Sequence, residues 1–228
     1  MSNNLPQPLV TCWLSWVAIP TGDQAGVMAA VGLTRPVPVT FAEAEAAIEE
    51  AGHAGAEDDP DGCARVYVSP ELDGWTLVIG PWCDPSDRER SDEVLRLCVE
   101  LSCRYGAAHA FFFGAQGDGS AWLVAEKGAV VRRYCETGEA GDASLTLGPP
   151  LEREQVERER MGLPPVWDER LRNGAAEEEW KWRAFDMAPE IAAALGTSPL
   201  ALTARTEVRG IGVLADTPAA DCPVPVVQ

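Results

Sequence analysis

The sequence has little histidine and none of the short motifs that mark common catalytic sites. Its two histidines are His53 and His109, whereas general acid–base chemistry and zinc binding rely heavily on this side chain. The motifs H-E-x-x-H, G-x-S-x-G and G-x-x-x-x-G-K-[ST] are all absent from the sequence. The sequence therefore favours a non-catalytic protein over an enzyme, and it predicts no catalytic residue, metal site or cofactor.

Long apolar runs and paired cysteine motifs are also missing. No stretch approaches the roughly 18 apolar residues that cross a bilayer, and no basic residue precedes the first apolar run, which argues against a signal peptide. The seven cysteines are an odd number without a C-x-x-C pair, so a secreted protein would keep one unpaired. In a reducing compartment free cysteine packs as a small apolar residue. We therefore expect a cytoplasmic protein.

Basic residues are scarce relative to acidic ones. The chain has 18 Lys and Arg against 36 Asp and Glu, a formal charge of −18. Such a surface repels phosphate backbones and anionic lipid, so the sequence predicts neither nucleic acid nor membrane as a partner. A basic protein is the complementary partner. Acidity also improves solubility, which is a non-functional explanation of the same charge.

The apolar pattern predicts an α+β fold with a mainly antiparallel sheet and helices packed on one face. A β-rich run at 9–19 predicts a buried strand, and Asp73-Gly74 predicts a hairpin turn within 64–82. Three further runs within 108–135 predict a meander with turns at 114–119 and at Lys127-Gly128. Hairpins in place of crossover helices argue against a parallel sheet.

Helical segments are expected in the first half of the chain and again after residue 148. The T-x-x-E pattern of Thr40 and Glu43 is a capping box, and apolar spacing predicts a helix that ends at Gly106. The predicted domains are an α+β core at 8–148, a helical C-terminal appendage at 149–215 packed on the core, and a loose tail at 216–228.

Two features are candidates for a partner-binding surface. Trp180 and Trp182 lie two positions apart on a predicted helix and therefore on nearly opposite faces. An exposed tryptophan beside acidic residues is typical of a binding anchor, although both rings could instead pack between the appendage and the core. The second feature is an acidic run whose members are Glu49, Glu50, Glu57, Asp58, Asp59 and Asp61.

The order of several motifs resembles that of an uncharacterised bacterial α+β family. These motifs are GWTLVIG at 74–80, the pattern W…G…VRRY…GE…G…G…L…E from residue 122 to residue 154, and PEIAAALGTSPLAL at 189–202. The resemblance covers about residues 64–203. Such small proteins are similar to the immunity proteins that accompany polymorphic toxins, which implies a protein partner and no transferable activity.

The leading hypothesis is therefore an immunity or antitoxin-type protein that neutralises a basic toxin domain. Acidic surfaces are steered quickly to basic clefts. A second hypothesis is a small enzyme or accessory protein of a biosynthetic cluster, which would use Asp84, Glu126 or Glu139 with Arg132 or Arg133. A third is a subunit of a larger assembly that docks through the tryptophan-bearing appendage. The sequence leaves the oligomeric state open.

Overall fold

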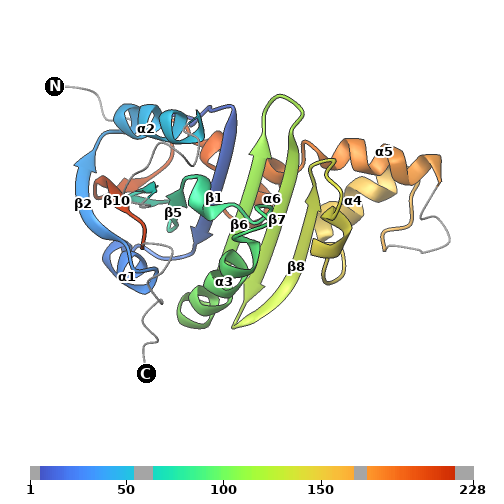
Figure 1. Ribbon diagram of the computed structural model, residues 1–228, viewed down its shortest axis with the longest axis horizontal. Helices are drawn as coiled ribbons and strands as arrows, with labels where there is room; N and C mark the ends of the chain where they lie inside the picture. Colours follow the sequence, from blue (N-terminus) through green and yellow to red (C-terminus); the bar gives the residue numbers. More distant parts are fainter. Residues whose placement is uncertain (1–5, 54–63, 167–173, 219–228) are drawn as a thin grey trace.

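A computed structural model describes residues 6–53, 64–166 and 174–218. Eight strands form one sheet in the order β2-β10-β3-β5-β1-β6-β7-β8, and every neighbouring pair is antiparallel (Figure 1). The strands of this sheet are β1 (Trp13–Ile19), β2 (Thr34–Val39), β3 (Arg65–Val68), β5 (Thr76–Ile79), β6 (Ala107–Gly114), β7 (Gly119–Glu126), β8 (Ala129–Glu136) and β10 (Gly212–Asp216). The α+β fold with an antiparallel sheet is confirmed.

Helices cover both faces of this sheet, not the single face that the sequence suggested. The α-helices are α1 (Gln24–Ala30), α2 (Phe41–His53), α3 (Ser91–Tyr105), α4 (Glu152–Arg160), α5 (Ala175–Ala184) and α6 (Ala188–Leu195). One core layer joins α1 and α3 to strand residues such as Val17, and the other joins α2, α5 and α6 to Trp16 and Trp122. Strand side chains alternate between the two layers, so both faces of the central strands are buried.

The local turn and capping signals are confirmed. Asp73 and Gly74 have φ angles of 50° and 88°, and Lys127 and Gly128 have φ angles of 49° and 82°, as tight hairpin turns require. The Thr40 backbone N–H donates to the Glu43 carboxylate at 2.7 Å, and the Glu43 N–H donates to the Thr40 hydroxyl at 3.3 Å. These contacts form the reciprocal capping box at the start of α2.

The C-terminal part of the chain contributes a strand to the sheet, which corrects the predicted domain boundaries. Gly212–Asp216 was expected at the end of a helical appendage and the start of a loose tail, but it forms β10 between β2 and β3. Asp216 is buried and forms ion pairs with Arg35 and Arg65. These five residues form a strand because they pair with β2 and β3, which lie much earlier in the chain. So short a run gives no sequence signal of that pairing. Residues 219–228 of the predicted tail lie outside the described residues.

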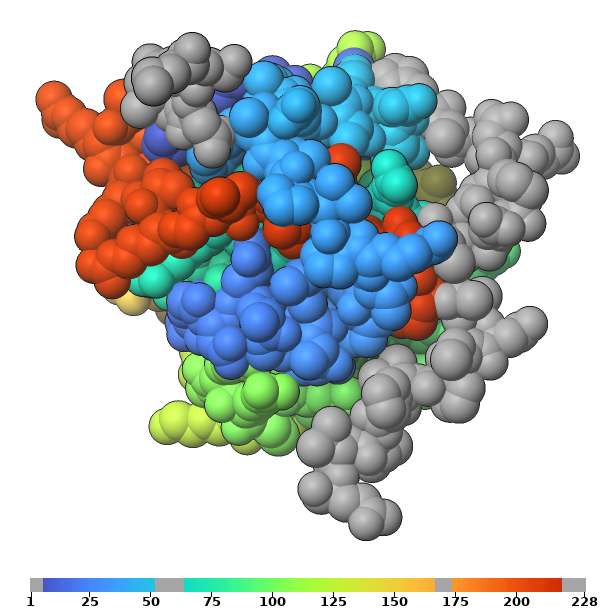
Figure 2. Space-filling view, turned by 90° about the vertical axis from the view of Figure 1, so that its left-hand side faces the viewer, coloured from blue at the N-terminus to red at the C-terminus, as the bar shows by residue number. Residues whose placement is uncertain are grey.

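The outer edge of the sheet at β2 is closed to further pairing. Pro36 and Pro38 lack the N–H that a neighbouring strand would need, and among the described strands β2 pairs with β10 alone. Figure 2 shows this side of the molecule, where α1, β2 and α2 lie side by side in shades of blue.

His109 on β6 is a buried residue that is expected to make stability depend on pH. Its ring packs near Trp75 and Phe111, its Nε2 has no hydrogen-bond partner, and burial lowers its pKa from 6.5 to about 4. Between these values the unfolded chain binds a proton that the folded protein does not, so stability falls as the pH falls from 6.5 to 4. This pKa shift sets an upper limit of about 3 kcal/mol on the loss of stability.

The measurement compares the parent protein with His109→Leu by urea unfolding at pH 7 and pH 5. The loss of stability on acidification should be smaller in the variant, whatever constant offset the substitution introduces. If the free energy of unfolding fell equally in both proteins between pH 7 and pH 5, His109 would not contribute to acid sensitivity.

Candidate functional site

The α4 helix is highly charged in sequence, yet the structure buries three of its charged side chains, all of which form ion pairs. Arg132 of β8 donates to both Glu154 carboxylate oxygens, at 3.0 Å from Nε and 2.6 Å from Nη2. Glu154 is fully buried and also accepts the Trp122 indole N–H at 3.2 Å. Gly148 lies so close to the Val131 carbonyl that an added Cβ would stand 2.1 Å from it. The chain therefore returns tightly against β8 before α4 begins.

A second set of ion pairs fixes α5 against α4. Arg158 donates to Glu177 at 2.8 and 3.3 Å, and both side chains are buried. Burial alone would raise the pKa of Glu157, but hydrogen bonds from Arg160 and Arg183 hold it down at about 2. The Arg183 Nε to Glu157 Oε1 distance is 2.7 Å. This network places α5 next to the C-terminal end of β8.

The two tryptophans of α5 point to opposite sides, as their spacing predicted. Trp180 is 2% exposed, its Nε1 donates to the Tyr134 hydroxyl at 3.0 Å, and the Arg158 guanidinium lies 5.1 Å from its ring centroid. Trp182 is 72% exposed and stacks on Phe185 with 5.5 Å between ring centroids. Trp180 thus anchors α5 to the core, whereas Trp182 presents its ring to solvent.

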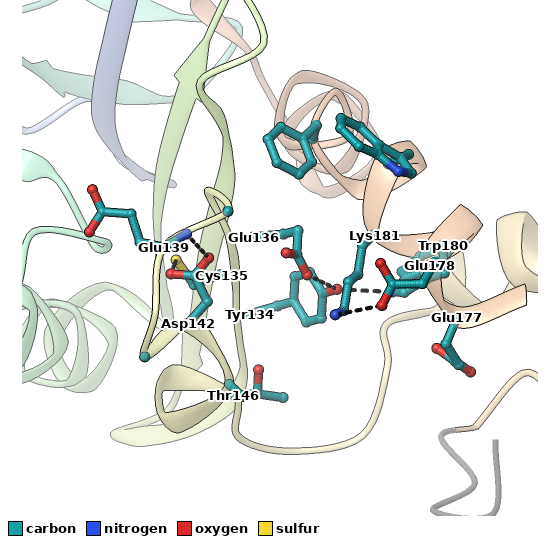
Figure 3. A pocket seen from close by; sticks show the side chains of 15 residues that line it. Tyr134, Cys135, Glu136, Glu139, Asp142, Thr146, Glu177, Glu178, Trp180 and Lys181 are labelled. Carbon is teal, nitrogen blue, oxygen red and sulfur yellow. Dashed lines mark hydrogen bonds and ion pairs between the residues drawn. The ribbon is translucent and has the colours of Figure 1, made fainter. Parts of the chain in front are cut away.

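A pocket of about 670 Å³ opens between the end of β8, the following loop and α5 (Figure 3). Among the described residues of its lining, the side chains that carry a full charge are five carboxylates and one lysine: Glu136, Glu139, Asp142, Glu177, Glu178 and Lys181. Trp180, Trp182 and Phe185 provide aromatic surface in the same lining. The volume falls in the range of ligand pockets, roughly 300–1,000 Å³.

Glu136 at the end of β8 is the carboxylate with the most unusual environment in this pocket. Burial raises its pKa above the ordinary value, with Asp142 and Glu178 adding to the effect and nearby Lys181 opposing it. Its Oε2 accepts the Tyr134 hydroxyl proton at 3.3 Å. Within the described residues no Lys or Arg forms an ion pair with Glu136. A cation entering the pocket would offset the free-energy cost of burying the charged Glu136 carboxylate.

The other carboxylates of the pocket already have partners. Asp142 accepts the backbone N–H of Thr137 at 2.7 Å and that of Glu139 at 3.3 Å, which shapes the loop after β8. Glu178 pairs with Lys181 at 3.1 Å. The Cys135 thiol is no candidate nucleophile, because burial and the adjacent Asp142 raise its pKa.

The structure separates the two binding features expected from the sequence. Glu49 and Glu50 lie on α2, while Trp182 lies on α5, and these helices occupy opposite ends of the molecule in Figure 1. Glu57, Asp58, Asp59 and Asp61 lie outside the described residues. The acidic neighbours of Trp182 are instead the carboxylates of the pocket.

The residues considered for an enzyme do not meet at one site. Arg132 is held by Glu154, Arg133 lies near Asp92 and the Pro85 carbonyl, and Glu126 is exposed at the end of β7. Asp84 lines a separate hollow of about 170 Å³, where burial raises its pKa to about 6 against hydrogen bonds from Ser86. Only Glu139 reaches the pocket.

The sequence predicted a meander within 108–135 but not the acidic pocket that begins where this meander ends. The available signal was ETGEAGD at 136–142, a glycine-rich acidic exit from a buried strand. The opposite wall comes from α5, so the pocket depends on a tertiary contact that the strand pattern does not contain.

Comparison with protein-family models, curated proteins and solved structures finds no match to this chain. None of the helices in the described ranges is long and apolar enough to cross a membrane. Likewise, the described His, Cys, Asp and Glu side chains include no group of three or more that could hold a metal ion.

Proposed function

We propose that this protein is a non-catalytic acidic binding module of the immunity or antitoxin type, which neutralises a basic toxin partner in the cytoplasm. The observation that carries the proposal is the exposed ring of Trp182 on the lining of a pocket rich in carboxylates. Tryptophan is enriched among residues that dominate binding energy at protein interfaces.

The charge of the whole chain supports the same conclusion. With a net charge of −18, the protein attracts a basic surface over a distance set by ionic strength. Complementary charge speeds association and suppresses wrong partners more than it adds affinity. The firmly held α5 adds a rigid support for Trp182, so little conformational freedom is lost when a partner binds.

The test is capture of the partner by the tagged protein from lysate of its own cells. We expect one basic protein in stoichiometric amount, with affinity falling at least roughly ten-fold when salt rises from about 50 to about 500 mM. Reversal of charge in the acidic run, beginning with Glu50→Lys, tests whether that surface shares in binding.

An unrelated protein of similar size and net charge serves as the control bait. Proteins that it also captures bind through non-specific charge attraction and are excluded. The proposal would be rejected if no stoichiometric partner were captured. It would also be rejected if the captured partner responded neither to salt nor to charge reversal on this protein.

A further inference from the structure

We infer that the pocket between β8 and α5 receives an arginine side chain of the partner protein, with its guanidinium against the Trp182 ring and paired with Glu136. This inference rests on the proposed function and names the chemistry that the pocket recognises. The occupant follows from charge complementarity, because the described part of the lining holds five carboxylates and one lysine.

The partners already present in the pocket show which carboxylate remains for a ligand. Glu177 is held by Arg158 at 2.8 Å, Glu178 by Lys181 at 3.1 Å, and Glu139 by Arg88 at 3.0 Å. The carboxylate of Asp142 accepts N–H groups of its own loop. Glu136 has the Tyr134 hydroxyl as its hydrogen-bond donor, and its pKa is raised by burial. Among the described carboxylates of the pocket, Glu136 is therefore the one with which an entering cation would pair.

Among the lining residues that the structure describes, Lys181 is the cation that could oppose this arrangement. It extends from α5 toward the space that Glu136 enters from β8, as Figure 3 shows. Its ammonium donates to Glu178, and this hydrogen bond is the main reason that its pKa is raised. Lys181 and Glu178 thus balance one another, and the rest of the described lining is net negative.

The aromatic surface selects arginine over lysine. A guanidinium is planar, stacks on aromatic rings and donates to a carboxylate through two parallel N–H groups, whereas an ammonium is a compact, strongly hydrated charge. This part of the fold already packs arginine on rings twice, with Arg132 over Tyr134 and Arg158 over Trp180, each at 5.1 Å from the centroid. Trp182 offers a further ring that is exposed to solvent, whereas the ring of Trp180 is buried.

The size of the pocket favours an arginine carried on a protein segment. A volume of about 670 Å³ leaves room for backbone and neighbouring side chains beside one guanidinium. The carboxylates of Glu139 and Glu178 lie at exposed positions in the lining, where adjacent basic residues of the same segment would meet them.

The test titrates the capped tripeptide acetyl-Gly-Arg-Gly-amide into nitrogen-15-labelled protein at low salt. Nuclear magnetic resonance signals of the Trp182 indole N–H and the backbone amides of 136–142 should shift together, with millimolar affinity. The matched peptide with citrulline, which keeps the shape and lacks the charge, should bind at least roughly ten-fold more weakly. The lysine peptide should be weaker by roughly three-fold or more. Equal binding of the arginine and citrulline peptides, or of the arginine and lysine peptides, would overturn the inference.

Three variants locate the binding. Glu136→Gln should weaken the arginine peptide roughly ten-fold, and Trp182→Ala should weaken it roughly three- to five-fold. Glu179→Gln removes the same charge from an exposed position of α5 outside the pocket, so it should change affinity less than about two-fold. Thermal melting of each variant confirms that it is folded. Equal effects of Glu136→Gln and Glu179→Gln would overturn the assignment of Glu136.

The two proposals fail in different ways. If a basic partner is captured and its affinity ignores Glu136→Gln and Trp182→Ala, the binding-module function stands and the pocket inference is wrong. If the arginine peptide binds as expected but no partner is captured, the pocket recognises guanidinium and the immunity-type function is wrong.

Discussion

Replacing Arg132 by methionine is expected to destabilise the protein by about 3–5 kcal/mol. The substitution leaves the Glu154 carboxylate fully buried, and the Trp122 and Leu151 N–H groups are the donors that remain to it among the described residues. An uncompensated buried charge costs far more than the pair contributes, because desolvation is no longer offset. Urea unfolding at pH 7 measures the change as a lower midpoint at similar slope.

The double variant Arg132→Met with Glu154→Leu provides the control. It removes both charges and fills the space with apolar atoms, so it should recover most of the lost stability. If the double variant were as unstable as Arg132→Met alone, the cost would come from lost packing around Arg132 and not from the stranded carboxylate.

Replacing Trp180 by alanine should cost about 3–5 kcal/mol, whereas replacing Trp182 should change stability by less than about 0.5 kcal/mol. Trp180 fills the core beneath α5 and donates to Tyr134, so its loss leaves a cavity and removes the hydrogen bond that the Tyr134 hydroxyl accepts. Trp182 is 72% exposed and loses mainly its contact with Phe185.

The two tryptophan variants control one another, since they make the same change two positions apart on one helix. Guanidinium unfolding followed by far-ultraviolet circular dichroism avoids dependence on tryptophan fluorescence. Similar losses in both variants would contradict the orientation of α5. A stable Trp182→Ala protein is also the form needed to test binding without unfolding.

Local sequence signals predicted the parts of the fold that a few adjacent residues determine. Asp73-Gly74, Lys127-Gly128 and the Thr40–Glu43 box each specify a turn or helix start within four positions. The placement of β10 was not predicted, because its five residues gain strand character only by pairing with β2 and β3. Sequence position gave no indication of that pairing.

The partly buried α4 shows a second reason why part of the fold could not be predicted from the sequence. Its sequence EREQVERER has the composition of a solvated helix, yet Glu154, Glu157 and Arg158 are buried. Glu154 and Arg158 are compensated by Arg132 and Glu177, which lie in other elements and are brought close only by the tertiary structure. Glu157 pairs with Arg160 of the same helix and also with Arg183 of α5. Helical spacing separated Trp180 from Trp182 correctly, but it did not place the Glu136 pocket beside them.

The position of β10 between β2 and β3 also constrains the order of events during synthesis. Residues of β2 leave the ribosome early, but their sheet partner lies near the other end of the described chain. At about 5–20 residues per second, β2 waits roughly ten to thirty seconds for that partner. The prolines that block its outer edge in the folded protein also limit what the unpaired segment can join in the meantime. The sheet can therefore be completed only after nearly the whole described chain has been synthesised.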